Sequence, residues 1–370
     1  MTASRLHQLS AQGQSVWLDF VSRQALEDGT IERLIREDAV VGLTSNPSIF
    51  EKAIAAGDHY DEQLREVLRE TEDGKEAFLA LAVRDIQAAC DLLREAFDRS
   101  GGVDGFVSIE VDPRLAGDRG ATDEEARRLK KLVDRDNVYI KIPATTPGIG
   151  AIEDTIAAGI PVNVTLIFSI ERHREVMEAY LSGLERLVES GGDPTNVPSV
   201  ASFFVSRVDT EADRRLEEAG APKELQGKLA VANAKLAYQA YEEVFRGERW
   251  EALKAKGAKV QRPLWASTST KNPAYRDVLY VEELIGPETV NTMPPETIEA
   301  FQDHGNVAAT LEQGIDEARK VFDDVRAAGV DLDDVFVTLE REGVKKFADA
   351  FAELFENVKK KRDELAAATT

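Results

Sequence analysis

The sequence predicts an α/β fold in which one parallel sheet closes into a (β/α)8 (TIM) barrel, with additional helices toward the C-terminus. Three observations lead to this prediction. Eight short β-like runs alternate with long amphipathic stretches. The chain has 370 residues, enough for one barrel of about 250 residues and a helical extension. Several runs also carry polar residues at alternate positions, where the covered strands of a parallel sheet are normally apolar.

The expected strands are short runs rich in β-branched and aromatic residues. In chain order they are 16–20, 40–45, 105–112, 137–143, 161–168, 199–207, 263–269 and 288–292. The intervals contain amphipathic stretches that predict helices, among them 75–98, 123–134, 171–189 and 223–246. Strands separated by helices in this way favour parallel pairing, and eight of them favour closure into a barrel.

Two local signals mark helix starts within this pattern. Thr122 and Glu125 have the spacing of a capping box ahead of the helix that follows. Asn46 and Pro47 supply a capping side chain and then a proline at the first helical position.

The region after the eighth strand, about 295–366, has the pattern of a long helical tail. Five apolar residues share one helical face there: Phe347, Phe351, Leu354, Phe355 and Val358. We expect this C-terminal extension to pack on the barrel, so that residues 1–370 form a single domain. The sequence contains no apparent repeat, low-complexity segment or Pro/Gly/Ser linker.

The formal net charge of −22 limits the partners that can be expected. A field of this sign repels DNA, RNA and anionic lipid, so we expect neither nucleic acid nor membrane as a partner. The same field repels a phosphorylated substrate. A phosphate site would therefore need a few local cations and backbone donors, while most acidic surface residues serve solubility.

Cys90, the one cysteine in the sequence, lies at helical spacing with apolar neighbours and is expected in the core rather than at a reactive site. A single cysteine cannot build a disulfide framework, which fits a reducing compartment. No apolar run reaches the length of about 18 residues expected of a membrane span, and no secretory signal is evident. The expected location is the cytoplasm.

Within the expected strands, the residues opposite the apolar set recur with a period of two. They are Asp19, Ser108, Glu110, Asp112, Lys141, Asn163, Thr165, Ser202, Phe204 and Ser206. If the apolar set packs under the helices, this second set points into the barrel. Active sites of this fold lie at the C-terminal strand ends, so we interpret the set as catalytic. The alternative is a buried polar network that only stabilises the barrel.

Metal, nucleotide and hydrolytic chemistry find little support. The histidines have no partner at ligand spacing, and His173 falls in a charged helical stretch where a solvated side chain is expected. Neither a GxGxxG nor a GxxxxGK[ST] phosphate loop occurs, and no Ser/His/acid arrangement is readable. We therefore expect no metal and no cofactor, and we disfavour zinc-aldolase, hydrolase and dehydrogenase functions.

What remains is an interior lysine, Lys141, accompanied by carboxylates. Exclusion of water lowers the pKa of a lysine in general, which exposes the neutral amine that attacks a carbonyl. Glu110 and Thr165, with a water, could move the protons of imine formation, and Asp19 could be the base for C–C cleavage. The iminium is then the electron sink. The alternative for Lys141 is an ordinary ion pair with Glu110 or Asp19.

Several longer motifs occur in order along the chain. WLDF, GLTSNPSIF, SIEVD, YIKIPAT, NVTLIFS, SFFVSRVD and WASTSTKNP lie within about residues 10–300, and EREGVKKFADAF follows near the C-terminus. Together these segments resemble the transaldolase family, specifically its longer bacterial type. Because many motifs coincide in the family's order, the resemblance is specific.

The resemblance implies a class I Schiff-base enzyme of the non-oxidative pentose phosphate pathway that needs no cofactor. Such an enzyme moves a dihydroxyacetone unit from fructose 6-phosphate or sedoheptulose 7-phosphate to erythrose 4-phosphate or glyceraldehyde 3-phosphate. Its partners are therefore small phosphorylated sugars, and members of the family occur as monomers or dimers.

Motif matches also imply a role for individual residues. Lys141 of YIKIPAT is the nucleophile, and Asp19 of WLDF is the acid/base for bond cleavage. Glu110 and Thr165 hold the catalytic water. The hydroxyls of the dihydroxyacetone arm are bound by Asn46, Asn163 and Ser202.

Arg207 matches the phosphate-binding arginine of the family. In shorter transaldolases a second arginine follows the seventh strand, after a serine. Here the serine is Ser267, but STSTKNP supplies Lys271 in place of that arginine. A lysine meets phosphate as a point charge, without the bidentate fork. Arg276 is the alternative second cation, and the sequence leaves the choice open.

Two other functions stay open at this point. The related fructose-6-phosphate aldolases, which release free dihydroxyacetone, carry tyrosine and glutamine where transaldolases carry phenylalanine and glutamate. Here these positions of the substrate site are Phe204 and Glu110, which favours transfer. A catalytically silent barrel acting as a scaffold would explain the fold but not the intact polar set.

Overall fold

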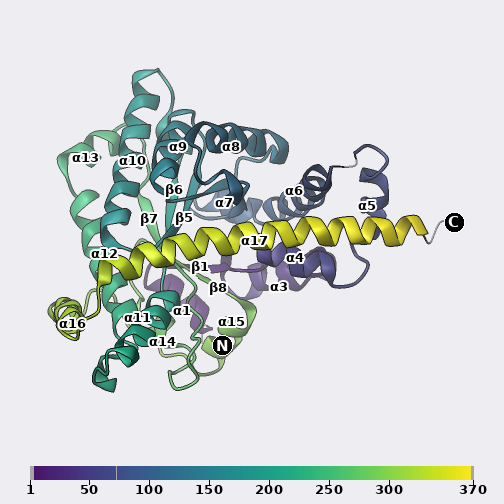
Figure 1. Cartoon of the computed structure of the whole chain (residues 1–370). Coiled ribbons are helices and arrows are strands. Elements are labelled where there is room, and N and C mark those ends of the chain that lie inside the picture. The colour runs from purple at the N-terminus through teal and green to yellow at the C-terminus, as the bar shows by residue number, and fades with distance from the viewer. Residues whose placement is uncertain (1–3, 72, 368–370) are drawn as a thin grey trace.

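The protein folds as a closed barrel of eight parallel strands surrounded by helices (Figure 1). The computed structural model describes residues 4–71 and 73–367. Strands pair in chain order, and β8 pairs with β1 to close the sheet. They are β1 (Gln14–Leu18), β2 (Val40–Leu43), β3 (Phe106–Glu110), β4 (Val138–Pro143), β5 (Val162–Ile167), β6 (Ser199–Phe204), β7 (Gln261–Ala266) and β8 (Thr289–Met293). The predicted (β/α)8 barrel and its strands are confirmed.

Several strands end earlier than predicted, so Asp19 and Asp112 follow β1 and β3 rather than lying within them. At β6 the difference places a candidate site residue on a helix. β6 ends at Phe204, and Ser206 begins helix α11 (Ser206–Glu218), so Ser206 and Arg207 lie on the first turn of a helix. The apolar run 199–207 contains no glycine or proline to mark this boundary. The amide of Val205 donates to the carbonyl of Ala266 at the end of β7, and the amide of Ser206 donates to the carbonyl of Ser267, the residue after β7.

The register of the sheet brings the main polar side chains to one level of the barrel. Glu110 lies opposite Lys141 across β3 and β4, and Lys141 lies opposite Asn163 across β4 and β5. Successive residues of a strand point to opposite faces, and residues paired across neighbouring strands share a face. These three side chains therefore lie together in the barrel interior. Thr165 lies two residues further along β5 on the same face.

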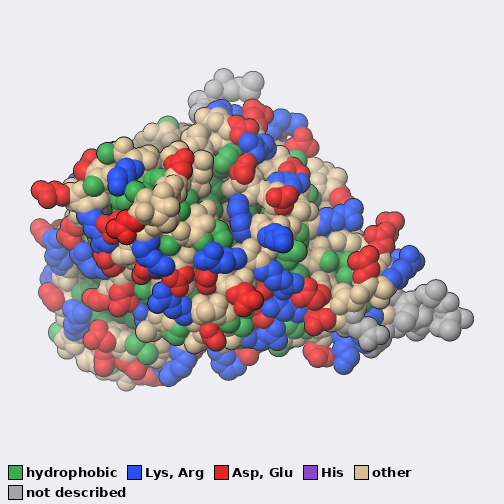
Figure 2. Space-filling model, turned by 90° about the horizontal axis from the view of Figure 1, so that it is seen from above, with side chains coloured by type: hydrophobic (Ala, Val, Ile, Leu, Met, Phe, Trp, Pro, Cys, Tyr) green, Lys and Arg blue, Asp and Glu red, His purple; other side chains and the backbone are tan. Residues whose placement is uncertain are grey.

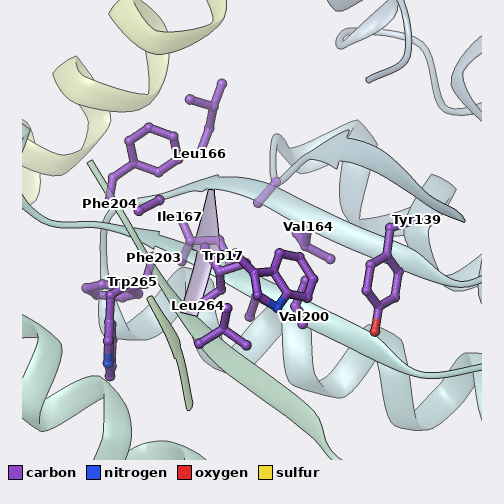
Figure 3. Close-up of a cluster of buried hydrophobic side chains, with 14 of the residues drawn as sticks. Trp17, Tyr139, Val164, Leu166, Ile167, Val200, Phe203, Phe204, Leu264 and Trp265 are labelled. Atoms are coloured by element: carbon purple, nitrogen blue, oxygen red, sulfur yellow. The ribbon is translucent and has the colours of Figure 1, made fainter. Parts of the chain in front are cut away.

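The strands of the barrel are buried on both faces, and apolar packing predominates outside the polar interior. Apart from Val41, which is partly exposed, the strand residues are buried. Figure 3 shows part of this packing, in which Phe203 of β6 lies near Trp265 of β7. Their ring centroids are 6.2 Å apart and the planes meet at 87°. Each fully buried large apolar side chain contributes roughly 1.5–3 kcal/mol, and this shell offsets the polar groups inside the barrel.

Helices cover the barrel and form the connections at both of its ends. The α-helices are α1 (Arg5–Ala11), α2 (Arg23–Glu27), α3 (Thr30–Glu37), α4 (Pro47–Ala55), α5 (Asp61–Val67), α6 (Gly74–Leu92), α7 (Arg94–Arg99), α8 (Arg119–Val133), α9 (Thr146–Ala157), α10 (Ile170–Glu189), α11, α12 (Leu229–Val244), α13 (Glu248–Lys254), α14 (Leu279–Glu283), α15 (Pro295–His304), α16 (Ile315–Ala327) and α17 (Leu332–Ala367). The 3-10 turns are η1 (Pro113–Leu115), η2 (Pro194–Asn196) and η3 (Lys223–Leu225).

The start of α4 is as predicted. Asn46 caps this helix by accepting a hydrogen bond from the Ile49 amide at 3.1 Å, and Pro47 follows at the first helical position.

The predicted capping box at Thr122 and Glu125 is wrong. Helix α8 begins earlier, and Asp118 is its cap, accepting a hydrogen bond from the Ala121 amide at 3.0 Å. An aspartate satisfies the free amides of a helix start as well as a threonine does, so the earlier residue takes the position. Thr122 then lies within the helix and donates to the Leu115 carbonyl instead.

Of two side chains assigned from helical spacing, one was predicted correctly. Cys90 is fully buried, as expected. His173 was expected in solvent but is also fully buried on α10, with its ring 5.7 Å from the ring of Phe203. Charged residues flank it in sequence, whereas Val176 and Met177, three and four positions on, share its buried face. Burial lowers the pKa of His173 to about 4, which keeps the ring neutral.

The C-terminal extension consists, in the described residues, of α15, α16 and α17. α15 lies against α1 and β8, α16 packs on α12, and α17 packs on α4, α6 and α11. Figure 1 shows α17 as a long helix that runs across the molecule. Its predicted apolar face is buried at Phe347, Phe351, Leu354 and Val358. The extension therefore passes over helices that follow several different strands of the barrel.

The molecular surface carries both signs of charge. Acidic and basic side chains are interspersed over the face in Figure 2. Many form ion pairs between helices, such as Arg249 with Glu178 and Glu185. Exposed pairs of this kind contribute only about 0–1 kcal/mol each. Within the described ranges, no helix combines the length and the apolar character that crossing a bilayer requires.

A close contact between β1 and β2 provides a test of the packing. A methyl group at Gly42 would lie 2.4 Å from a ring carbon of Trp17, so the ring or the strand would have to move. We predict that Gly42→Ala lowers the free energy of unfolding by about 1–3 kcal/mol in chemical denaturation. Gly117→Ala is the matched control, because the added methyl group meets no atom within 4 Å. Equal effects of the two substitutions would contradict this packing.

Candidate active site

A cavity of about 750 Å³ opens at the C-terminal ends of the strands. Most of the residues singled out in the sequence line it: Asp19, Asn46, Lys141, Thr165, Ser202, Phe204, Arg207, Ser267 and Lys271. Glu110 and Asn163 are not part of its wall, but each contacts a residue that is. This end of the barrel is where enzymes of this fold carry their active sites.

The Lys141 amine lies at the inner end of this cavity. The residue is only 5% exposed. Its Nζ is 3.2 Å from Glu110 Oε2 and donates a hydrogen bond to the Ser45 carbonyl oxygen, also at 3.2 Å. The ring of Phe347, from α17, lies 5.4 Å from Nζ. The amine is thus held away from bulk water, yet it remains in the cavity wall.

Asp19 follows the last residue of β1 and is fixed by its neighbours. Its backbone amide donates to the Met293 carbonyl at 2.8 Å. Oδ1 accepts a hydrogen bond at 2.7 Å from Thr44, whose hydroxyl is also 2.7 Å from the hydroxyl of Thr292. Burial raises the pKa of Asp19, although the nearby charge of Lys141 opposes this. A carboxylate with a raised pKa is suited to accepting and returning a proton.

Glu110 and Thr165 each provide a buried polar atom that has no partner in the described residues. These atoms are Oε1 of Glu110 and Oγ1 of Thr165. Oε2 of Glu110 is instead paired with Lys141 Nζ at 3.2 Å. Burial raises the pKa of Glu110, and the charge of Lys141 opposes it. Buried polar atoms without a protein partner are costly unless something else binds them. These atoms therefore fit a site for a small polar group beside the lysine.

Asn163 lies behind the cavity wall rather than in it. Its amide nitrogen donates to the Ser108 hydroxyl at 2.9 Å, and its amide oxygen accepts from the Ser202 hydroxyl at 2.7 Å. Ser202 does line the cavity, so the network fixes the orientation of its hydroxyl group. Asn46 lines the cavity while its oxygen caps α4.

Cations gather where the cavity opens. Arg207 lies over the ring of Phe204, with its guanidinium carbon 4.9 Å from the centroid. The Ser267 hydroxyl is 2.8 Å from the Ser206 hydroxyl, and Ser267 has a positive φ of 57° that turns the chain after β7. Lys271 also lines the cavity. Arg276 does not, because its guanidinium binds Glu282 and the His304 carbonyl instead.

The residues of the cavity wall that were not identified as site residues from the sequence include Lys52 of α4, and Lys346 and Phe347 of α17. Phe347 was assigned only to the apolar face of a tail helix. EREGVKKFADAF was a usable signal, since it contains Lys346 and Phe347 and resembles a family motif. The role of this segment could not be inferred from its position in the sequence, because only the folded chain places α17 over the strand ends.

The fold is a (β/α)8 barrel that holds a buried lysine near two carboxylates and cations at the cavity mouth. This arrangement is that of a lysine-dependent enzyme that acts on anionic carbonyl compounds. In the parts of the chain that the structure describes, no group of His, Cys, Asp and Glu side chains is placed to hold a metal ion.

Comparison with known proteins specifies the family. The model of the Transaldolase/Fructose-6-phosphate aldolase family matches residues 16–358. A transaldolase of Frankia alni is 54% identical over 352 residues, which are 94% of this chain and 95% of the relative. A transaldolase of Mycolicibacterium paratuberculosis is 54% identical over 366 residues, or 97% and 98% of the two chains. Transaldolase 1 of Streptomyces coelicolor is 53% identical over 365 residues, or 98% and 96%.

The chain therefore belongs to the transaldolase/fructose-6-phosphate aldolase family, as the motifs predicted, and it is an enzyme with transaldolase function.

The raised pKa of Asp19 has a consequence for stability. The folded protein holds this proton more tightly than the unfolded chain does, so the ionised carboxylate costs stability above the raised pKa. We predict that Asp19→Asn increases the free energy of unfolding at pH 7.5 by roughly 1 kcal/mol. The gain should shrink as the pH falls through the raised pKa, and it should be lost below the ordinary aspartate pKa of about 3.9, where the unfolded chain is also protonated.

Thermal and denaturant unfolding at a series of pH values would measure this difference. Asp58→Asn, at an exposed position, is the control and should change stability by less than about 0.5 kcal/mol at any pH. A gain at Asp19 that does not depend on pH would show that its charge is not the cause.

Proposed function

We propose that the protein transfers a dihydroxyacetone unit between phosphorylated sugars through a Schiff base on Lys141. Fructose 6-phosphate and sedoheptulose 7-phosphate are the donors, and glyceraldehyde 3-phosphate and erythrose 4-phosphate are the acceptors. One observation carries the proposal: the Lys141 amine is 5% exposed, lies 3.2 Å from a buried carboxylate and faces a cavity that also contains Asp19. Phe204 and Glu110 at the positions that distinguish transaldolases favour transfer over release.

The first step forms the imine. Lys141 passes a proton to Glu110, and the neutral amine attacks the ketone carbon of the donor. A water held by Glu110 and Thr165 carries a proton to the carbinolamine hydroxyl, which leaves as water and gives the iminium. Oε1 of Glu110 and Oγ1 of Thr165, which are buried without a partner in the described residues, support this role.

The second step breaks the carbon–carbon bond. Asp19 takes the proton of the C4 hydroxyl, the C3–C4 bond breaks, and its electron pair enters the iminium to form an enamine. The aldehyde product leaves. The enamine then attacks the acceptor aldehyde while Asp19 returns its proton, and hydrolysis of the new iminium releases the product ketose. The raised pKa of Asp19 supports both proton transfers.

The remaining residues hold the substrate. Asn46 and Ser202 bind the hydroxyls of the three-carbon arm, and Asn163 orients Ser202 from behind the wall. Arg207, Ser267 and Lys271 bind the phosphate, whereas Arg276 is committed to Glu282.

We further propose that the chain acts in the cytoplasm as a monomer or homodimer.

We also propose that residues 1–370 form one domain, in which the extension, about 295–366, is packed on the barrel. The contacts of α17 with α4, α6 and α11 support this arrangement.

Trapping tests the nucleophile. Borohydride added with fructose 6-phosphate should attach a reduced three-carbon adduct to the peptide that contains Lys141, as read by peptide mass spectrometry. Lys141→Ala should lose both the adduct and turnover while circular dichroism shows an intact fold. Lys254→Ala, at an exposed lysine, should retain both. An unchanged mass of the wild-type protein would contradict a Schiff base on Lys141.

Asp19→Asn separates imine formation from cleavage. The amide cannot take the hydroxyl proton, so turnover should fall by about 10²–10⁴-fold, the range of a lost general base. Because imine formation does not need this base, borohydride should now trap the whole six-carbon sugar phosphate on Lys141 rather than the three-carbon unit. Complete absence of an adduct would move the role of Asp19 to an earlier step.

A further inference from the structure

Cations line the mouth of the cavity from separate parts of the described chain: Lys52 on α4, Arg207 on α11, Lys271 after β7 and Lys346 on α17. The charges found to act on Lys346 are those of Arg207, Lys271 and Lys52, and together with partial burial they lower its pKa. Like charges repel, so this grouping costs free energy unless an anion enters.

The surroundings of Lys345, the residue before Lys346, show that the grouping of cations around Lys346 does not simply follow from the amino-acid composition. Lys345, one residue earlier on α17, pairs with Asp349 at 2.6 Å and is exposed to solvent. The chain has 68 Asp and Glu against 46 Lys and Arg, so carboxylate partners are abundant. Lys346 nevertheless lies among cations. Glu51, Glu296 and Glu353 also line the cavity, but the charges found to act on Lys346 are positive. A cluster of cations in an acidic protein attracts an anionic ligand.

The position of Lys346 on α17 connects it to the reacting groups. The next residue, Phe347, has its ring 5.4 Å from Lys141 Nζ and 5.9 Å from the Arg207 guanidinium carbon. α17 also packs against α4 and α11, the helices that carry Lys52 and Arg207. The same turn of α17 therefore covers the amine and adds a cation to the cavity mouth.

We propose that Lys346 binds the phosphate of the sugar together with Arg207, so that the C-terminal helix α17 forms part of the substrate site. This inference rests on the proposed function. It assigns to the extension a direct contact with substrate in addition to its packing on the barrel.

The chemistry of lysine suits this position. The donors differ by one carbon, as do the acceptors, so the phosphate lies at different distances from the carbon bound at Lys141. A guanidinium offers a planar fork of fixed geometry, whereas an ammonium on a flexible four-carbon stem contacts phosphate from many directions. Arg207, packed against Phe204, is restrained. Lys346 then follows the phosphate as the chain length changes.

The test compares two acceptors that differ only in the phosphate: D-glyceraldehyde 3-phosphate and D-glyceraldehyde, with fructose 6-phosphate as donor. Because a covalent intermediate separates the half-reactions, kcat/KM for the acceptor reports only on the second one. Lys346→Ala should lower kcat/KM for the phosphorylated acceptor about tenfold, through the lost charge-assisted contact. It should change kcat/KM for D-glyceraldehyde by less than about twofold.

Two further variants complete the comparison. Lys345→Ala removes the same charge one residue away and should leave both values unchanged, while Lys346→Arg should restore part of the preference for phosphate. An equal loss with both acceptors would assign Lys346 a structural role, and no loss with either would remove it from the site; each result overturns the proposal. Borohydride trapping on Lys141 in the Lys346→Ala variant, at saturating donor, should persist. Failure of trapping in the wild type would instead count against the Schiff base.

Discussion

The buried contact between Lys141 and Glu110 is the interaction on which the chemistry proposed for this protein depends. Backbone pairing sets it, because the register of β3 and β4 places the two residues opposite each other inside the barrel. Neither group is stable there alone, since an isolated charge in a dry interior is very costly. In the proposed chemistry the two groups exchange a proton over 3.2 Å, which makes a neutral amine available to a carbonyl compound.

The surrounding structure provides the conditions for this exchange. Apolar packing between strands and helices stabilises the fold and offsets the free-energy cost of burying polar groups inside the barrel. Phe347 excludes water from one side of the amine, and the cations at the cavity mouth reverse locally the repulsion that a net charge of −22 exerts on a phosphorylated substrate. Both features depend on α17, which lies more than 180 residues after Lys141 in sequence and reaches the site only by packing across α4 and α11.

The sequence predicted the barrel and several polar residues that line the cavity from periodicity, whereas Asn46, Arg207, Ser267 and Lys271 came from the family resemblance. A period of two identifies which strand residues share a face, and parallel pairing brings the strand ends together. Features that depend on competition between neighbouring residues were less predictable. Asp118 displaced Thr122 as a helix cap, and the apolar surroundings of His173 outweighed its charged sequence neighbours. Lys346 and Lys52 were missed because nothing local in a charged helix shows that the residue meets a distant cavity.

A crystal structure of the enzyme soaked with fructose 6-phosphate tests the central claim most directly. The proposed chemistry predicts continuous electron density from Lys141 Nζ to the second carbon of the sugar or of its three-carbon fragment, with Asp19 beside the C4 oxygen. A sugar bound in the cavity with its carbonyl carbon turned away from Lys141, and no covalent bond to that amine, would contradict it.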